Sequence, residues 1–326
     1  MRKLLFSLFV FPFITFSLHA KDQITLQLKW VPQAQFMGYY VAKEKGFYTA
    51  ENLDVILKAG GPDIAPPQVI AGGGADLIVE WLGTALSAKE KGVDLVNVAQ
   101  IFKKSSLMLT CRKDSGIQSS KDLRGKTVGV WFFGNEYPFL AWMAKLNLPI
   151  DGKKDSVTVL KQGFNVDPLL QNQAACISTT SYNEYQQVLE AGMAEKDLIN
   201  FVYQDQGVGT LEDGIYSLQK NLENKEMFNK IVRFVRASLK GWNYASTHQE
   251  EAVEIVLKND NTGAQTKAHQ TTMAKEVAKL LDKKQLGYLD PKDFDRTVNI
   301  LLSGKSTPVI TKKPTHAWTH EVWKAL

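Results

Sequence analysis

The stretch 24-ITLQLKWVPQAQFMGYYVAKEKGFY-48 predicts the fold of this chain. Its first residues alternate, so Ile24 and Leu26 lie on one face of a strand and polar side chains on the other. Pro32 ends that strand, because proline has no amide hydrogen to donate to a sheet. Aromatic residues then recur at helical spacing until Gly46, a residue type that commonly ends helices. The stretch therefore predicts a strand, a loop and a helix.

The loop after this first strand is a candidate binding site. In open α/β sheets, ligands bind beyond the carboxyl ends of the strands, where such loops lie. This loop carries Trp30, Gln33 and Gln35, an aromatic ring beside two amides. Tyr39, on the following helix, is a further candidate, with packing in the helix interface as its alternative role. We expect a planar, neutral-to-polar small molecule to bind here.

Predicted strands and helices keep alternating along the chain, which is typical of mostly parallel sheets covered on both faces. With 326 residues, 44% of them hydrophobic, the chain is long enough for two lobes. A second α/β unit opens near 107, and residues 205–216, rich in glycine and acids, are expected to cross back to the first lobe. The remainder is predicted to be nearly all helical, with helices over 225–246, 249–259, 264–281 and 291–304.

Composition excludes several classes of function. The formal net charge of +5 is mild and forms no clustered basic stripe, so nucleic acid is not expected as a partner. The cysteine and histidine spacings match no metal site, and no cofactor is predicted. Cys111 and Cys176 both lie in apolar runs that resemble strands. They permit one disulfide in an oxidising compartment, but two buried free thiols is the preferred interpretation.

The N-terminus reads as a cleaved secretory signal. Arg2 and Lys3 precede the apolar run 4–18, and the predicted cleavage lies near Ala20. A signal anchor is the alternative, although the apolar run is short for a membrane span. No cysteine follows the run, so a lipid anchor is not expected. The mature protein is predicted to be soluble and exported to a bacterial periplasm.

Several motifs together resemble a known family. These are 26-LQLKWVPQAQFMGYYVAKEKGFY-48, the glycine-preceded strand 75-ADLIV-79, 121-KDLRGKTVGV-130 and 182-YNEYQ-186. They resemble the solute-binding proteins of bacterial ABC importers, in the branch that includes thiamine-pyrimidine-precursor binders and pyrimidine synthases. The resemblance implies a two-lobed α/β type II periplasmic binding fold with a ligand cleft between the lobes. It also implies a helical C-terminal region on the first lobe, a monomer, and a partner permease in the inner membrane.

The resemblance further predicts a division of the chain and a role. A signal peptide over 1–20 precedes a first lobe made of 21–106 and 207–326, with a second lobe over 107–206. In the pyrimidine synthases, the segment matching 76–92 carries a lysine that holds pyridoxal phosphate and a histidine that is consumed. Glu80 and Thr84 stand at those positions here, and the cysteine-rich segment of the synthases is absent. A binding protein is therefore predicted rather than an enzyme, with the synthase as an alternative of another class.

A pyrimidine needs apolar faces for stacking and donors or acceptors at its edge. Loops that follow predicted strands offer both, and in the resembled binders aromatics and a carboxylate from such loops hold the ring. Glu184 in the 182-YNE-184 segment is the nearest match to that carboxylate, and Glu80 is the second candidate for edge recognition; either could instead be an acid at a helix N-terminus. The predicted ligand-binding residues are Trp30, Gln33, Gln35, Tyr39, Glu80, Trp81, Phe133, Asn135, Glu136, Tyr137, Asn165, Tyr182, Asn183 and Glu184.

The ligand itself stays open between three classes. A thiamine pyrimidine precursor agrees best with the aromatic and acidic loops. Riboflavin suits the number of aromatic residues equally well. A sulfonate such as taurine would use free amides at a turn such as 134–136, but Glu80, Glu136 and Glu184 would repel an anion.

Overall fold

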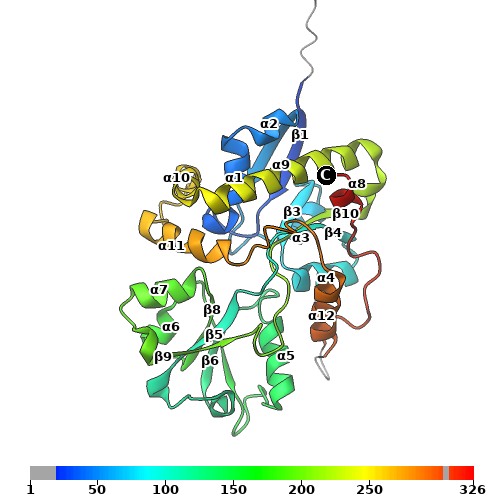
Figure 1. Cartoon of the computed structure of the whole chain (residues 1–326). Coiled ribbons are helices and arrows are strands. Elements are labelled where there is room, and N and C mark those ends of the chain that lie inside the picture. The colour runs from blue at the N-terminus through cyan, green and yellow to red at the C-terminus, as the bar shows by residue number, and fades with distance from the viewer. Residues whose placement is uncertain (1–19, 304–307) are drawn as a thin grey trace, which may run out of the picture.

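The computed structural model describes residues 20–303 and 308–326, so the predicted signal peptide lies almost entirely outside the described residues. The chain forms two lobes, each built on a five-stranded sheet (Figure 1). The first sheet has the order β2 (Leu53–Lys58), β1 (Asp22–Gln27), β3 (Leu77–Glu80), β10 (Gly214–Leu218) and β4 (Leu95–Gln100). The second has the order β7 (Thr158–Lys161), β6 (Thr127–Val130), β8 (Cys176–Thr180), β5 (Leu107–Arg112) and β9 (Leu198–Val202).

Both sheets are mixed, where the alternation of elements predicted mostly parallel ones. β1 pairs in parallel with β2 and β3, and β6 pairs in parallel with β7 and β8. β10 in the first sheet and β5 in the second are each antiparallel to both of their neighbours. These two strands are the ones that follow a passage between lobes. They enter their sheets from the other lobe rather than through a helical crossover, so nothing requires them to run parallel.

The first lobe carries most of the helices, including the C-terminal ones. The long helix α9 crosses α1, and Trp242 of α9 packs edge-on against Tyr39 with ring centroids 5.5 Å apart (Figure 1). The predicted helical C-terminal region is thereby confirmed. The first-lobe helices are η1 (Ala34–Phe36), α1 (Met37–Glu44), α2 (Phe47–Ala50), α3 (Pro66–Ala71), α4 (Leu82–Glu90), α8 (Gln219–Glu223), α9 (Lys225–Thr247), α10 (Gln249–Asn259), α11 (Lys267–Ala278), α12 (Pro291–Leu302) and α13 (Glu321–Lys324).

The second lobe has shorter helices around its sheet. Its hydrophobic core joins Trp142 of α5 to Phe201 and Tyr203, with ring centroids 5.3 and 5.8 Å away. Pro138 lies in the first turn of α5, where a missing amide hydrogen costs nothing. The second-lobe helices are η2 (Lys113–Ser115), η3 (Ser120–Leu123), α5 (Tyr137–Leu146), α6 (Asp167–Leu170), α7 (Glu184–Glu190) and η4 (Glu195–Asp197).

Cys111 and Cys176 form a disulfide, so the preference for two free thiols was wrong. The two cysteines lie directly opposite each other where β5 and β8 pair antiparallel. Directly opposed residues on antiparallel strands hold their side chains on the same face and close together. The sequence placed both cysteines in strands but did not show that these strands are neighbours.

Two segments, 101–106 and 203–213, carry the chain between the lobes, and a buried carboxylate joins them. Glu212 of the second segment accepts hydrogen bonds from the Ser105 Oγ at 2.7 Å, the Ser106 amide at 2.9 Å and the Leu107 amide at 3.2 Å. Its other oxygen accepts from the Ser106 Oγ at 2.5 Å. The lobe boundaries that we propose, at 106/107 and 206/207, fall within or directly beside these two segments.

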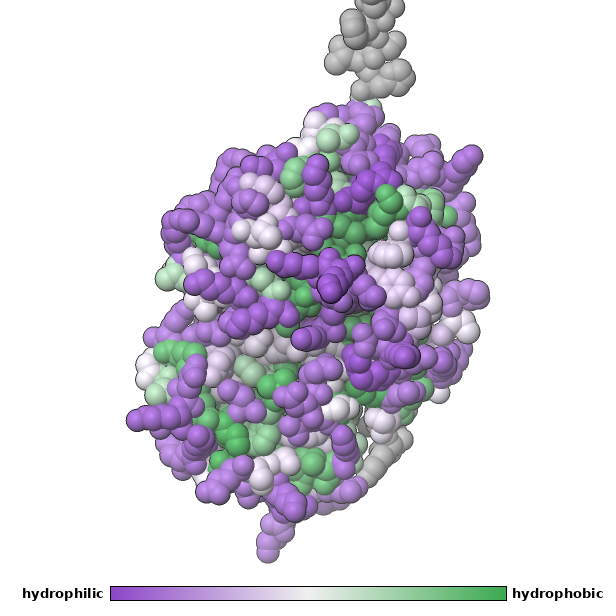
Figure 2. All heavy atoms as spheres, in the orientation of Figure 1, coloured by the Kyte–Doolittle hydropathy of each residue, from purple (hydrophilic) through white to green (hydrophobic). Residues whose placement is uncertain are grey.

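Hydrophilic side chains cover most of the face drawn in Figure 2, with smaller hydrophobic patches between them. Within residues 20–303 and 308–326, no helix has the length and apolar character that a membrane crossing requires.

Candidate functional site

A cavity of about 700 Å³ lies between the lobes. Its walls are formed by the loops that follow β1, β2 and β3 and by part of α4 in the first lobe, and by the loops that follow β6, β7 and β8 in the second. This is the carboxyl edge of the parallel strands in both sheets, where ligands of open α/β folds bind. The volume lies within the range of about 300–1,000 Å³ that is usual for small-molecule sites.

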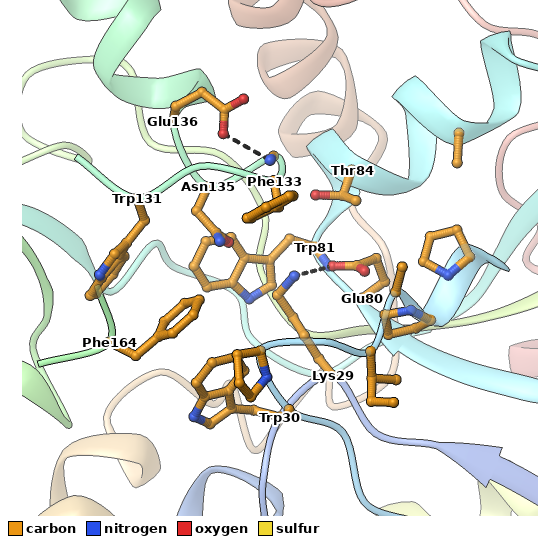
Figure 3. A pocket seen from close by; sticks show the side chains of 18 of the residues that line it. Lys29, Trp30, Glu80, Trp81, Thr84, Trp131, Phe133, Asn135, Glu136 and Phe164 are labelled. Atoms are coloured by element: carbon orange, nitrogen blue, oxygen red, sulfur yellow. Dashed lines mark hydrogen bonds and ion pairs between the residues drawn. The ribbon is translucent and has the colours of Figure 1, made fainter. Parts of the chain in front are cut away.

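Lys29 and Glu80 form an ion pair in the first-lobe wall (Figure 3). The Glu80 side chain is only 1% exposed, and its Oε1 also accepts a hydrogen bond from the Trp81 amide at 2.8 Å. The Lys29 ammonium lies 4.8 Å from the centroid of the Trp81 ring, within range of a cation–π contact. The sequence analysis singled out Glu80 and Trp81 for this wall but missed Lys29, which follows β1 by two residues.

A chain of hydrogen bonds fixes the polar side chains of the first-lobe wall. Gln33 Nε2 donates to Gln35 Oε1 at 2.7 Å, and Gln35 Nε2 donates to Asp213 Oδ2 at 2.8 Å. The other oxygen of Asp213 accepts from Trp81 Nε1 at 2.8 Å. Burial raises the pKa of Asp213 to about 6. Asp213 lies in the segment 203–213 that joins the lobes, and it holds two predicted site residues, Gln35 and Trp81, in place. In the sequence, only the acid- and glycine-rich composition of 205–216 pointed to this segment.

Aromatic rings from both lobes face each other across the cavity (Figure 3). Trp30 of the first lobe contacts Phe164 of the second, with centroids 4.5 Å apart and planes tilted by 54°. Trp131 lies beside them, held by a 3.0 Å hydrogen bond from its Nε1 to the Gly163 carbonyl. Phe133 is 72% exposed and lines the cavity, whereas its neighbour Phe132 does not. Trp131 and Phe164 were missed, although they lie one and three residues beyond the ends of β6 and β7.

The loop between β6 and α5 closes tightly on the first lobe. Gly134 has φ +98°, and a Cβ there would lie 2.3 Å from Thr84 Oγ1, so this position requires glycine. Glu136 Oε2 accepts a hydrogen bond from the Gly134 amide at 2.8 Å, and burial raises the pKa of Glu136. Asn135 donates from Nδ2 to the Phe132 carbonyl at 2.9 Å. Its buried Oδ1 has no hydrogen-bond partner among the described residues, so it is free to accept a hydrogen bond from a ligand.

The 182-YNE-184 segment also reaches the cavity. Glu184 Oε2 accepts from the amide and Oγ1 of Thr180, at 3.0 and 2.8 Å, and its Oε1 accepts from Asn183 Nδ2 at 2.8 Å. Burial raises the pKa of Glu184. The residue is the first of α7, as its alternative role requires, and it also lines the cavity. Tyr182 lies within the first-lobe core, 6.3 Å from the Phe102 ring, and contributes to the wall.

Two predicted residues do not line the cavity. Tyr39 is buried against Trp242, which was its alternative role. Asn165 is exposed, and its Oδ1 accepts from the Asp167 amide at 3.2 Å. Residues 61–68, which follow β2 and run into α3, also form part of the wall and were not predicted to do so. The predicted residues that do line the cavity are Trp30, Gln33, Gln35, Glu80, Trp81, Phe133, Asn135, Glu136, Tyr137, Tyr182, Asn183 and Glu184.

Comparison with known proteins places the chain in one family, whose members among its relatives carry different names. The family model described as "NMT1/THI5 like" matches residues 33–252. A formylaminopyrimidine-binding protein of Halalkalibacterium halodurans is 25% identical over 74% of this chain and 72% of its own length. A riboflavin-binding protein of Chloroflexus aurantiacus is 26% identical over 73% of this chain and 66% of its own. A 4-amino-5-hydroxymethyl-2-methylpyrimidine phosphate synthase of Saccharomyces cerevisiae is 27% identical over 44% of this chain and 42% of its own.

Solved structures share the fold. A Candida albicans protein with the generic periplasmic binding protein fold has a TM-score of 0.62 and 16% identity, covering 93% of this chain and 94% of its own. The alkanesulfonate-binding protein SsuA of Xanthomonas axonopodis has a TM-score of 0.63 and 12% identity, covering 88% of this chain and 94% of its own. The predicted two-lobed α/β fold is thereby confirmed.

Proposed function

This chain belongs to the NMT1/THI5-like family, and we propose that it is the periplasmic solute-binding protein of an ABC importer, capturing a planar heteroaromatic ligand of the thiamine-pyrimidine-precursor class. The observation that carries the proposal is the cavity between the lobes, whose two walls supply aromatic rings from both sides. A formylaminopyrimidine-binding relative supports the ligand class. The protein would be exported, act as a monomer and deliver its ligand to an inner-membrane permease.

The polar groups of the cavity suit a neutral or weakly basic ring. Three carboxylates, those of Glu80, Glu136 and Glu184, face the cavity, and Lys29 is already paired with one of them. A sulfonate or a phosphate ester would meet net negative charge here, which raises its energy in a partly buried site. The free acceptor on Asn135 suits an exocyclic amino group. We therefore favour an unphosphorylated aminopyrimidine over taurine.

Capture would proceed by stacking and lobe closure. Trp30 and Phe164 approach from opposite lobes, so a ring held between the walls contacts both lobes at once. A ligand shifts a protein toward the closed form only when it binds that form better than the open one. Contacts from both walls supply this difference, and closure would present the binding protein to its permease.

The enzyme alternative rests on the synthases among the relatives. Against it, Thr84 and Glu80 stand where the resemblance places the reactive histidine and the cofactor lysine. Lys29 lies in the cavity, but its ammonium is paired with Glu80 and lies against the Trp81 ring. A Schiff base requires an amine that is free to attack the aldehyde, and the ion pair with Glu80 already engages this one. We therefore propose binding without catalysis.

Trp30→Ala and Trp131→Ala are each expected to weaken binding of a formylaminopyrimidine about tenfold, because each removes one stacking surface. Isothermal titration calorimetry of the wild type and both variants measures this. Trp323→Ala is the matched control, since that ring lies on α13 and does not line the cavity. Unchanged affinity in both site variants, or an equal loss in the control, would contradict the stacking role.

A further inference from the structure

Helix α11 of the first lobe reaches across to the cavity wall of the second lobe. In Figure 1, α11 lies at the junction of the lobes, next to α7. The buried side chain of His269 makes the crossing contacts: its Nε2 lies 2.9 Å from Asn183 Oδ1, and its Nδ1 lies 3.0 and 3.1 Å from the two carboxylate oxygens of Glu190. One imidazole on the first lobe therefore contacts two residues of the second.

The surrounding hydrogen bonds assign which atom of Asn183 faces the ring. Asn183 Nδ2 donates to the carboxylate of Glu184 at 2.8 Å, so its Oδ1 is the atom that points to His269. Gln187 Nε2 also donates to that Oδ1 at 3.0 Å, which agrees with the assignment. Both ring nitrogens of His269 thus face hydrogen-bond acceptors. Only the doubly protonated ring donates to both, because a neutral imidazole has one N–H.

The next residue on α11 holds the opposite wall. Gln270 Oε1 accepts a hydrogen bond from the Ala34 amide at 2.6 Å. Ala34 lies between Gln33 and Gln35, which both line the cavity. Two consecutive residues of one helix therefore fix the first-lobe loop after β1 and the second-lobe loop after β8. The helix sets the separation of the two walls.

We propose that His269 is a positioning residue: it locks α11 to the second lobe and holds Asn183, and through it Glu184, in the orientation that binds ligand. The identity of the ligand rests on the proposed function. The latch, by which we mean the contacts of His269 with Asn183 and Glu190, rests on the structure alone. Opening the lobes would separate His269 from Asn183 and Glu190 at once. The latch therefore stabilises the closed form and is lost in the open one.

The first test compares His269→Gln and His269→Ala with the wild type at one pH, using a formylaminopyrimidine as the probe. His269→Ala should bind about tenfold more weakly than wild type, the equivalent of one hydrogen bond to a charged group. Glutamine keeps one donor toward Asn183, so His269→Gln should recover part of the lost affinity. Equal affinity of His269→Ala and wild type would overturn the proposal.

A second test needs no ligand. Amide hydrogen exchange over 181–190, measured at pH 6 in intact protein, should be faster in His269→Ala than in wild type, because the latch holds this segment. Lys275→Ala, an exposed position on the same helix, is the control and should exchange as wild type. Unchanged exchange in His269→Ala would overturn the latch. If wild type fails to bind the probe but the exchange result holds, the proposed function fails and the latch stands.

Discussion

Replacing Lys29 with methionine is expected to lower the free energy of unfolding by about 3–5 kcal/mol, the usual cost of removing one partner of a buried ion pair. Methionine keeps most of the apolar stem, so the loss arises from the charge. Glu80, only 1% exposed, would be left without its cation in the wall of the cavity. Urea unfolding at pH 7, followed by circular dichroism, measures the difference.

The double variant Lys29→Met/Glu80→Gln separates charge from packing. It removes both charges, so most of the lost stability should return, because a buried neutral pair avoids the uncompensated carboxylate. Lys91→Met is a matched control, since Lys91 lines the cavity from an exposed position. A single variant Lys29→Met with wild-type stability would show that Glu80 needs no cation.

Glu212 is expected to make the fold less stable as pH rises from about 4.5 to 7. Burial raises the pKa of this carboxyl from 4.5 to about 7, with neighbouring Asp213 adding to the effect. The folded protein therefore keeps a proton that the unfolded chain releases near pH 4.5. This contribution is fully present below the unfolded pKa and is lost as pH rises through the folded pKa, a change of about 3 kcal/mol.

Comparison with Glu212→Gln isolates this contribution from all other titrating groups. The glutamine side chain can still accept from Ser105 and donate to Ser106 Oγ, but it does not titrate. The wild type should lose about 3 kcal/mol relative to this variant between pH 4.5 and 8, measured by chemical denaturation at each pH. Parallel pH profiles for the two proteins would refute the role of Glu212.

The sequence predicted the loops of the site well because their positions follow from local patterns. The strand β1 (Asp22–Gln27) ends close to where the alternation ends, and Trp30 and Gln33, in the loop that follows, lie at the carboxyl edge of the sheet. The same reasoning placed Asn135 and Glu184 correctly at the cavity. Helices with strong apolar periodicity, such as α10, were predicted over the residues that the structure shows.

The missed residues depend on how distant segments meet. Lys29 lies in the wall because β1 and β3 are neighbours, which brings it to Glu80 51 residues along the chain. Asp213 joins Gln35 across 178 residues, and the disulfide joins residues separated by 65. Periodicity describes neighbours within one element and carries no information on which strands pair. The mixed character of the sheets was missed for the same reason. The direction of β5 and β10 is set by the passages between the lobes, which periodicity does not describe.

The related proteins differ in the ligands that their names give. One relative is named a riboflavin-binding protein, and riboflavin has a larger, fused ring system than a pyrimidine. The sulfonate-binding proteins resemble this chain in fold alone, at 12% sequence identity for the Xanthomonas protein.

The most direct test of the proposed capture is native mass spectrometry of protein purified from its own periplasm, followed by a thermal-shift panel of a formylaminopyrimidine, 4-amino-5-hydroxymethyl-2-methylpyrimidine, riboflavin, taurine and pyridoxal phosphate. We predict a co-purified, non-covalent pyrimidine, and the largest rise in melting temperature with an unphosphorylated aminopyrimidine. A shift with taurine alone, or a covalent mass increase with pyridoxal phosphate, would contradict non-covalent capture of a pyrimidine in the cavity between the lobes.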